Sequence, residues 1–120
     1  MPQTVLIVDD HARFRGFARR LLEAGGFEVV GEAGDGASAL AAVAALRPQL
    51  VLLDVVLPDT DGFEVAERIV ELGTATLVVL TSSRDAADFG ARLDRSRAHG
   101  FIHKDDLSAA ALSSLAGAPG

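Results

Sequence analysis

The segment Leu50-Val51-Leu52-Leu53-Asp54 decides the fold, because four consecutive apolar residues end on a single carboxylate. A run that is apolar at every position, without alternation, is typical of a strand buried on both faces of a parallel sheet. In open α/β sheets, ligands and chemistry lie just beyond the carboxyl ends of the strands. Asp54 therefore stands where a functional side chain is expected.

Four more segments, at about 4–9, 27–32, 76–81 and 100–103, predict the other strands. The one at 27–32 has interleaved glutamates, which fits a sheet edge. Helical patterns alternate with the strands. They run up to Gly25-Gly26, from Asp35 to Leu46, from Gly62 to Leu72, weakly within 84–98, and after a cap at Asp105 or Asp106.

Side-chain spacing predicts which helical residues face the sheet. The first helix has an apolar stripe at Phe14, Phe17, Ala18, Leu21 and Leu22, and the last has one at Leu107, Ala111 and Leu115. The arginines of the first helix lie off its stripe and are interpreted as a solvated face.

Five alternations of strand and helix predict an α/β fold. The expected architecture is a single doubly wound, flavodoxin-like, five-stranded parallel sheet of order 2-1-3-4-5 with helices on both faces. The 120 residues suit one domain, spanning 1–120.

Composition excludes several classes of function. A net charge of −6 argues against direct nucleic-acid binding, and the absence of cysteine excludes disulfides and thiolate sites. No apolar run is long enough for a membrane span and no signal peptide is visible, so a cytoplasmic location is expected.

The strand ends collect a distinctive set of side chains: Asp9, Asp10, Asp54, Thr81 and Lys104. Three carboxylates at the switch point of the sheet repel one another unless a cation joins them. Oxygen ligands without cysteine favour Mg²⁺ over Zn²⁺. A hydroxyl and an ammonium beside them could hold phosphoryl oxygens.

Four motifs, which follow one another along the chain, carry a resemblance to a known family. They are Val8-Asp9-Asp10, Leu53-Asp54 with Leu57-Pro58 and Asp61-Gly62, Leu80-Thr81-Ser82, and Gly100-Phe101-Ile102-His103-Lys104. Over essentially its whole length the chain resembles the receiver domain of two-component response regulators. Asp9-Asp10-His11 and Lys104-Asp105 are similar to receivers that usually carry a helix-turn-helix output domain, although no output domain is expected within 1–120.

The resemblance implies a role for each residue. Asp54 is the implied phosphoacceptor, served by a sensor histidine kinase or a phosphotransfer protein. Asp9, Asp10, Asp54 and the backbone carbonyl of Val56 are the implied Mg²⁺ ligands. Thr81 and Lys104 would hold phosphoryl oxygens, and Thr81 and Phe101 would form the switch.

The resemblance also implies an output. The face made by helix 4, strand 5 and helix 5 would change for a partner, and the chain could form a homodimer on phosphorylation. The expected protein is not an enzyme in the usual sense, because it catalyses only its own phosphorylation and dephosphorylation.

Alternatives remain open. A Mg²⁺-dependent phosphatase of the haloacid-dehalogenase type also uses a strand-end aspartate, but it needs a second acid two residues later, where Val56 stands. A receiver-like binding module that no longer uses phosphate is a second alternative. A flavin carrier needs a Ser/Thr-rich loop after the first strand. His11 and His103 are interpreted as non-ligands, and contact of Arg13 or Arg15 with a kinase stays an even choice.

Overall fold

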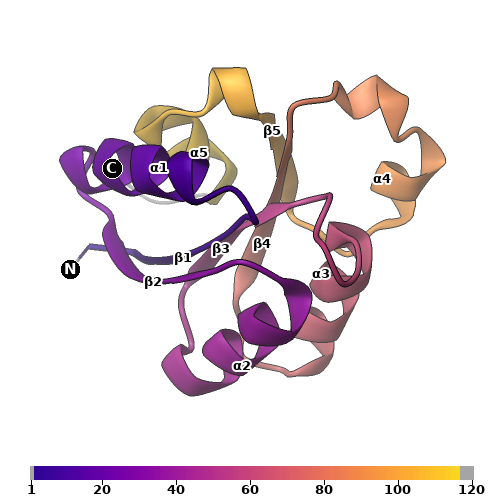
Figure 1. Ribbon diagram of the computed structural model, residues 1–120, viewed down its shortest axis with the longest axis horizontal. Coiled ribbons are helices and arrows are strands. Elements are labelled where there is room, and N and C mark those ends of the chain that lie inside the picture. Colours follow the sequence, from indigo (N-terminus) through magenta and orange to yellow (C-terminus); the bar gives the residue numbers. More distant parts are fainter. Residues whose placement is uncertain (1, 117–120) are drawn as a thin grey trace.

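The computed structural model describes residues 2–116 and contains a five-stranded sheet. All neighbouring strands are parallel, in the order β2-β1-β3-β4-β5 (Figure 1). The strands are β1 (Thr4–Val8), β2 (Glu28–Ala33), β3 (Leu50–Asp54), β4 (Leu77–Ser82) and β5 (Gly100–His103). The predicted fold class and strand order are confirmed.

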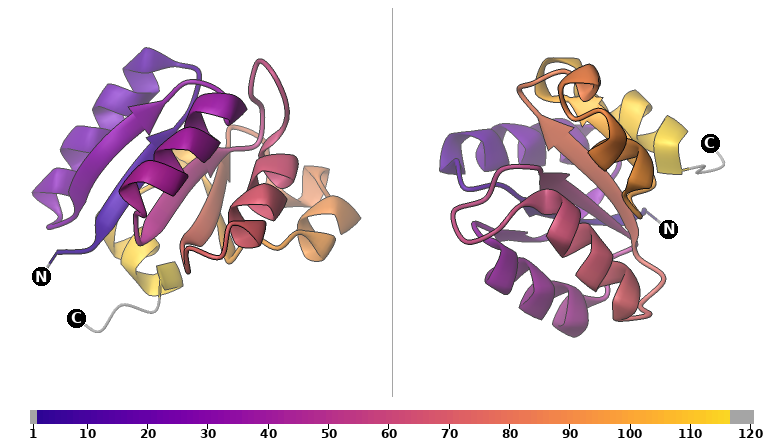
Figure 2. Two further views of the ribbon diagram at one scale, coloured as in Figure 1. Left: turned by 90° about the horizontal axis from the view of Figure 1, so that it is seen from below. Right: turned by 90° about the vertical axis from the view of Figure 1, so that its right-hand side faces the viewer.

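Helices cover both faces of the sheet (Figure 2). They are α1 (Ala12–Ala24), α2 (Gly36–Leu46), α3 (Gly62–Glu71), α4 (Ala91–Arg95) and α5 (Ala109–Ala116). α1 and α5 pack on one face, and α2, α3 and α4 pack on the other. No helix of residues 2–116 has the length and apolar character that a membrane span requires.

Strand β3 is buried along its whole length because it packs against both helical layers. Leu52 contributes to the core under α1 and α5, whereas Leu53 contributes to the core under α2 and α3. Successive side chains of a strand point to opposite faces, so each residue serves one core only. The unbroken apolar run of the sequence therefore has a direct structural reason.

Two helices begin at aspartate caps as the sequence predicts. The carboxylate of Asp35 accepts a hydrogen bond from Ser38 N at 2.7 Å, and that of Asp61 accepts one from Glu64 N at 2.9 Å. The predicted cap of the last helix is wrong. Lys104–Asp106 form a 3₁₀ turn, and Ser108 Oγ accepts from Ala111 N at 3.0 Å at the start of α5.

The apolar stripes are correct only in part. Ala18 and Leu22 of α1 are fully buried, but Phe17 is 48% exposed. In α5 the buried residue is Leu112, while Leu115 is 38% exposed. Leu107, just before α5, is buried and Ala111 packs against the same core, so the predicted stripe fails only at Leu115.

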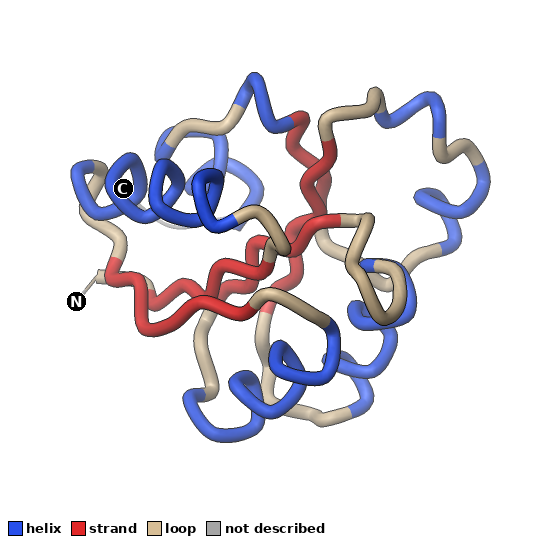
Figure 3. The backbone as a smooth tube through the Cα atoms, viewed as in Figure 1, coloured by secondary structure: helices blue, strands red, loops and turns tan. Residues whose placement is uncertain are grey.

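Residues 84–98 have little regular structure, as their polar composition predicts. They contain a 3₁₀ turn at Ala86–Asp88 and the five-residue α4, joined by loops (Figure 3). Because its helical turns are short, we expect this segment to open more readily than the longer helices.

Candidate functional site

Four of the five predicted strand-end side chains lie together in the structure, namely the three aspartates and Lys104. Lys104 Nζ lies 2.7 Å from Asp9 Oδ2 and 3.2 Å from Asp54 Oδ2. Asp10 joins them, because ligand atoms of Asp9, Asp10 and Asp54 lie within 4.8 Å of one another. Residues that are up to 95 positions apart in sequence therefore form one cluster at the carboxyl edge of the sheet.

The fifth residue, Thr81, is placed by strand register. Thr81 is the Cα partner of Asp54 in the β3–β4 pair, and it is buried. Paired residues of parallel strands point to the same face, so the hydroxyl lies on the side of the sheet that also carries Asp54. Each of the predicted site residues is therefore found at this edge of the sheet.

The Lys104 side chain is held from two sides. Its ammonium contacts the two carboxylates, and it also lies 4.5 Å from the centroid of the Phe14 ring on α1. A cation over an aromatic face is attracted by the ring quadrupole. Phe14 thus keeps the charged end of Lys104, which is 16% exposed, directed at Asp9 and Asp54.

The three charged groups shift one another's pKa values. Burial raises the pKa of Asp54, and the charge of Asp9 raises it further against the opposing effect of Lys104. Burial also disfavours the charged form of Asp9, but the close contact with the Lys104 ammonium and the hydrogen bond from the His11 backbone N–H bring the pKa of Asp9 below its usual range. Burial opposes the charge on Lys104, yet the two carboxylates raise its pKa. The ionised form is therefore disfavoured at Asp54 and favoured at Asp9.

The residues present fit a magnesium ion. Asp9 Oδ2 is buried, and within residues 2–116 its close contact with Lys104 is an ion pair that lacks hydrogen-bond geometry. This oxygen therefore keeps unused acceptor capacity. Asp10 is partly exposed and leaves the cluster open to water, as Mg²⁺ requires. A hard divalent ion would satisfy the oxygen atoms and relieve their mutual repulsion.

His11 lies closer to this cluster than its interpretation as a non-ligand suggests. Its backbone N donates to Asp9 Oδ1 at 2.8 Å, and its Nδ1 lies 3.1 Å from Asp9 Oδ1 and 3.0 Å from Asp10 Oδ1. The ring is 69% exposed and can swing away. Because imidazole suits Zn²⁺ better than Mg²⁺, we keep His11 as a hydrogen-bond partner of the acids.

The loop after β3 holds Asp54 and the predicted carbonyl ligand in place. Val56 N donates to Asp54 Oδ1 at 3.2 Å, and Gly62 N donates to the Val55 carbonyl at 2.7 Å. A Cβ atom at position 62 would lie 2.5 Å from the backbone oxygen of Asp54. Only glycine therefore allows α3 to begin so close to the phosphoacceptor candidate.

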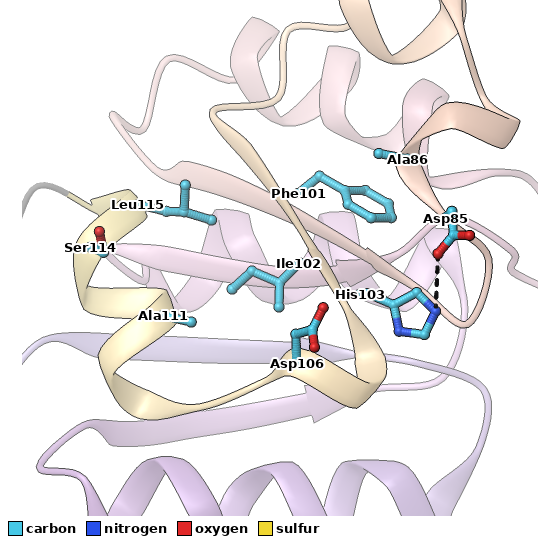
Figure 4. Close-up of a pocket in the computed structure, with 9 residues that line it drawn as sticks. All are labelled: Asp85, Ala86, Phe101, Ile102, His103, Asp106, Ala111, Ser114 and Leu115. Carbon is cyan, nitrogen blue, oxygen red and sulfur yellow. Dashed lines mark ion pairs between the residues drawn. The ribbon is translucent and has the colours of Figure 1, made fainter.

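The second predicted switch residue, Phe101, lies on the opposite face of the sheet from Thr81. Phe101 is the Cα partner of Leu80, and its ring packs 6.0 Å from that of Phe89, which lies 5.7 Å from that of Phe63. Phe101 also lines a surface cavity of about 500 Å³ with residues of β5 and α5 (Figure 4). Phe101 is half-buried, so it already contacts the core beneath α4.

His103 connects β5 to the loop after β4. Its Nε2 lies 3.0 Å from the Ser83 carbonyl, and its Nδ1 accepts from Asp105 N at 3.1 Å. The ring therefore donates through Nε2 to Ser83. Asp85 lies 3.8 Å away on the same side (Figure 4). Within residues 2–116 this histidine contacts backbone groups and lies outside the cluster of Asp9, Asp10, His11 and Asp54, and its interpretation as a non-ligand stays a prediction.

Two arginines of α1 are less solvated than the sequence predicts. Arg15 Nε and Arg19 Nε donate to the two carboxylate oxygens of Glu32 at 3.0 and 2.8 Å, and Arg15 Nη1 reaches the Asp9 carbonyl at 2.5 Å. The sequence offered a weak signal for this, since Arg15 and Arg19 are four residues apart and Glu32 interrupts the neighbouring strand. Sequence reasoning also missed Asp59, whose carboxylate caps α2 through Gly36 N at 2.8 Å.

Comparison with known proteins gives one consistent result. The family model of the response regulator receiver domain matches residues 5–114. A protein of Pseudomonas aeruginosa named as a transcriptional regulator is 40% identical over 117 residues, which are 94% of this chain and 56% of the relative. The transcription regulator BvgA of Bordetella pertussis is 38% identical over 106 residues, 88% of this chain and 51% of BvgA.

Solved structures agree. The signal receiver domain of NarL from Mycobacterium tuberculosis superposes with a TM-score of 0.89 at 34% identity, covering 98% of each chain. The present chain spans about half the length of the curated relatives it matches.

Proposed function

Because the chain belongs to the response-regulator receiver family of two-component signalling, we propose that it is a phosphorylation-activated switch whose phosphoacceptor is Asp54. The observation that carries this proposal is the cluster at the sheet edge, where Lys104 contacts both Asp9 and Asp54. Phosphoryl transfer depends on alignment and on neutralisation of developing charge, and these residues supply both.

In the proposed reaction, a carboxylate oxygen of Asp54 attacks the phosphorus atom of the donor. A new P–O bond forms to Asp54 while the bond between phosphorus and the donor atom breaks, and the electron pair leaves with the donor. Lys104 stabilises the negative charge on one phosphoryl oxygen, and the Thr81 hydroxyl donates to another. A magnesium ion held by Asp9, Asp10, Asp54 and the Val56 carbonyl would neutralise further phosphoryl charge when bound.

The proposed output lies on the α4–β5–α5 face. The register places the Thr81 and Phe101 side chains on opposite faces of the β4–β5 pair, and in the proposal a pull on Thr81 reaches Phe101 through the loop after β4. That loop leads into α4, whose five residues are held by few contacts. A change in α4 would alter the α4–β5–α5 surface that a partner or a second copy of the chain could bind.

Further parts of the proposal rest on the family. We propose that residues 1–120 act as a single receiver domain, that a sensor histidine kinase or phosphotransfer protein is the donor, and that the domain works in the cytoplasm. The chain would turn over no general phosphomonoester. Val56, 60% exposed, stands where a haloacid-dehalogenase phosphatase needs its second acid.

Intact-mass analysis tests the assignment. Wild type, Asp54→Asn and the surface control Asp94→Asn are incubated with Mg²⁺ and acetyl phosphate. We expect one phosphoryl group per chain on wild type and on Asp94→Asn, and none on Asp54→Asn. Equal uptake by all three proteins would show that Asp54 is not the acceptor. Repeated hydrolysis of a phosphomonoester would favour the phosphatase, and no uptake by wild type would favour the phosphate-independent binding module.

A further inference from the structure

Arg15 of α1 links the edge of the sheet to the backbone of the acid cluster. Its side chain is 21% exposed, so it is largely withdrawn from solvent. Nε donates to Glu32 Oε1 at 3.0 Å, and Nη1 donates to the main-chain carbonyl of Asp9. The other carboxylate oxygen of Glu32 accepts from Arg19 at 2.8 Å. Glu32 therefore holds the guanidinium in one orientation.

The consequence concerns the peptide groups on both sides of Asp9. Asp9 N donates to the Ala33 carbonyl at 3.0 Å, and the Asp9 carbonyl accepts from Arg15. The peptide before Asp9 is thus held by the Ala33 carbonyl of β2, and the peptide after Asp9 is held by Arg15, which itself binds Glu32 of β2. The direction of the Asp9 carboxylate and the start of Asp10 follow from these planes. Within residues 2–116 no other donor contacts the Asp9 carbonyl, so removing Arg15 leaves this oxygen without a protein hydrogen bond.

We propose that Arg15 is a positioning residue for the magnesium site, kept in place by Glu32. It touches neither the metal ligand atoms nor the phosphoryl group. It acts through the Asp9–Asp10 peptide, whose orientation sets how the two carboxylates converge. Partners that orient a metal ligand commonly contribute about ten- to a hundredfold to metal affinity. The inference rests on the proposed magnesium site and adds a residue that the site requires.

Simple electrostatics predicts the opposite effect. Arg15 carries a positive charge beside a cluster that attracts a cation, so removing that charge alone should tighten Mg²⁺ binding. Loss of positioning should weaken Mg²⁺ binding instead. The sign of the change in affinity therefore separates the two roles.

The variants are Arg15→Met, which keeps the apolar stem, and Arg13→Met, the matched control on the exposed side of α1. Glu32→Gln loosens the guanidinium without removing it. Mg²⁺ is titrated into each protein and followed by ¹H–¹⁵N NMR, which also reports whether the protein is folded. The initial rate of phosphorylation by acetyl phosphate is then measured as a function of Mg²⁺ concentration.

We expect Arg15→Met to raise the Mg²⁺ dissociation constant about tenfold and Glu32→Gln to raise it about threefold. Arg13→Met should leave it unchanged or slightly lower. The half-saturating Mg²⁺ concentration should rise, while the maximal phosphorylation rate at saturating Mg²⁺ stays near that of wild type. A merely structural role would lower the maximal rate through a smaller folded fraction and leave half-saturation unmoved.

A dissociation constant for Arg15→Met that is equal to or lower than that of wild type would overturn the inference and leave the proposed function intact. If Arg15→Met does not fold, the same comparison is made with Arg15→Gln, which also removes the positive charge, and an equal or lower constant overturns the inference. A wild type that neither binds Mg²⁺ nor takes up phosphate would overturn both proposals together.

Discussion

Neutralising Asp54 should stabilise the protein when no divalent ion is present. At an effective dielectric constant of about 20, the attraction between Asp54 and Lys104 at 3.2 Å is about 5 kcal/mol. Repulsion from one carboxylate no more than 4.8 Å away is at least about 3.5 kcal/mol, and a second, more exposed carboxylate adds a screened amount. The attraction and the repulsion on the Asp54 carboxylate nearly cancel, so the free-energy cost of burying its charge is left uncompensated.

Asp54→Asn removes this charge and leaves the Lys104–Asp9 pair at 2.7 Å intact. The amide oxygen can still accept from Val56 N. We expect the free energy of unfolding in EDTA to rise by about 1–2 kcal/mol, because burying a carboxylate costs several kcal/mol and the asparagine amide still has to be desolvated. The raised pKa of Asp54 agrees in sign, since the ionised form is disfavoured in the folded protein.

Magnesium should remove the difference. If the wild-type site is half filled at about 1 mM, 10 mM Mg²⁺ stabilises wild type by about 1.4 kcal/mol. Asp54→Asn loses a ligand and should gain less. Urea unfolding followed by far-UV circular dichroism is the suitable assay, because the chain has no Trp or Tyr.

Asp94→Asn, an exposed α4 acid, is the control and should follow wild type in both conditions. The reasoning is refuted if Asp54→Asn is less stable than wild type in EDTA. It is also refuted if Mg²⁺ stabilises all three proteins equally.

Three further changes test the surroundings of the site. Gly62→Ala should lower stability by about 1–3 kcal/mol and slow phosphorylation, because its Cβ would lie 2.5 Å from a backbone oxygen, whereas Gly16→Ala inside α1 should stabilise by about 0.5–1 kcal/mol in the same urea assay. The hydrogen bond from Arg19 lowers the pKa of Glu32 from its ordinary 4.5. The ionised Glu32 side chain therefore contributes about 0.5–1 kcal/mol to the free energy of unfolding above pH 4.5, and this contribution is lost as the pH falls through the lower folded-state pKa. The stability difference between wild type and Glu32→Gln should accordingly shrink between pH 6 and pH 3, and a constant difference would contradict this. Arg92→Gln removes an ion pair at 3.0 Å and a cation–aromatic contact at 4.6 Å, so amide exchange in residues 84–98 should speed up about three- to tenfold, for a local loss of about 1 kcal/mol, with exchange in α2 unchanged.

The strands and the acid cluster could be predicted from the sequence because both depend on local pattern. An apolar run buried on two faces needs no knowledge of its neighbours, and a carboxylate at its end falls at the sheet edge in any doubly wound fold. Asp54 and Lys104 were therefore predicted with the correct neighbours. The aspartate caps of α2 and α3 followed from the same kind of local rule.

The features that were missed depend on where main-chain groups point. Asp105, Asp106 and Ser108 can all cap a helix, and the 3₁₀ turn that selects Ser108 is set by tertiary packing. Arg15 was expected in solvent because the sequence shows its charge and hides the Asp9 carbonyl that it binds. Side-chain periodicity cannot reveal a backbone acceptor.

The proposed switch has to connect Thr81 on β4 with Phe101 on the neighbouring strand β5. Phe101 is the Cα partner of Leu80 and Thr81 that of Ile102, so the register places the two side chains on opposite faces of the β4–β5 pair. In our proposal the connection runs through the backbone after β4, where His103 Nε2 lies 3.0 Å from the Ser83 carbonyl oxygen. Beyond it, Phe89 packs on Phe101 at a centroid distance of 6.0 Å. If the loop moves on phosphorylation as proposed, we expect both the histidine contact and the aromatic contact beneath α4 to change.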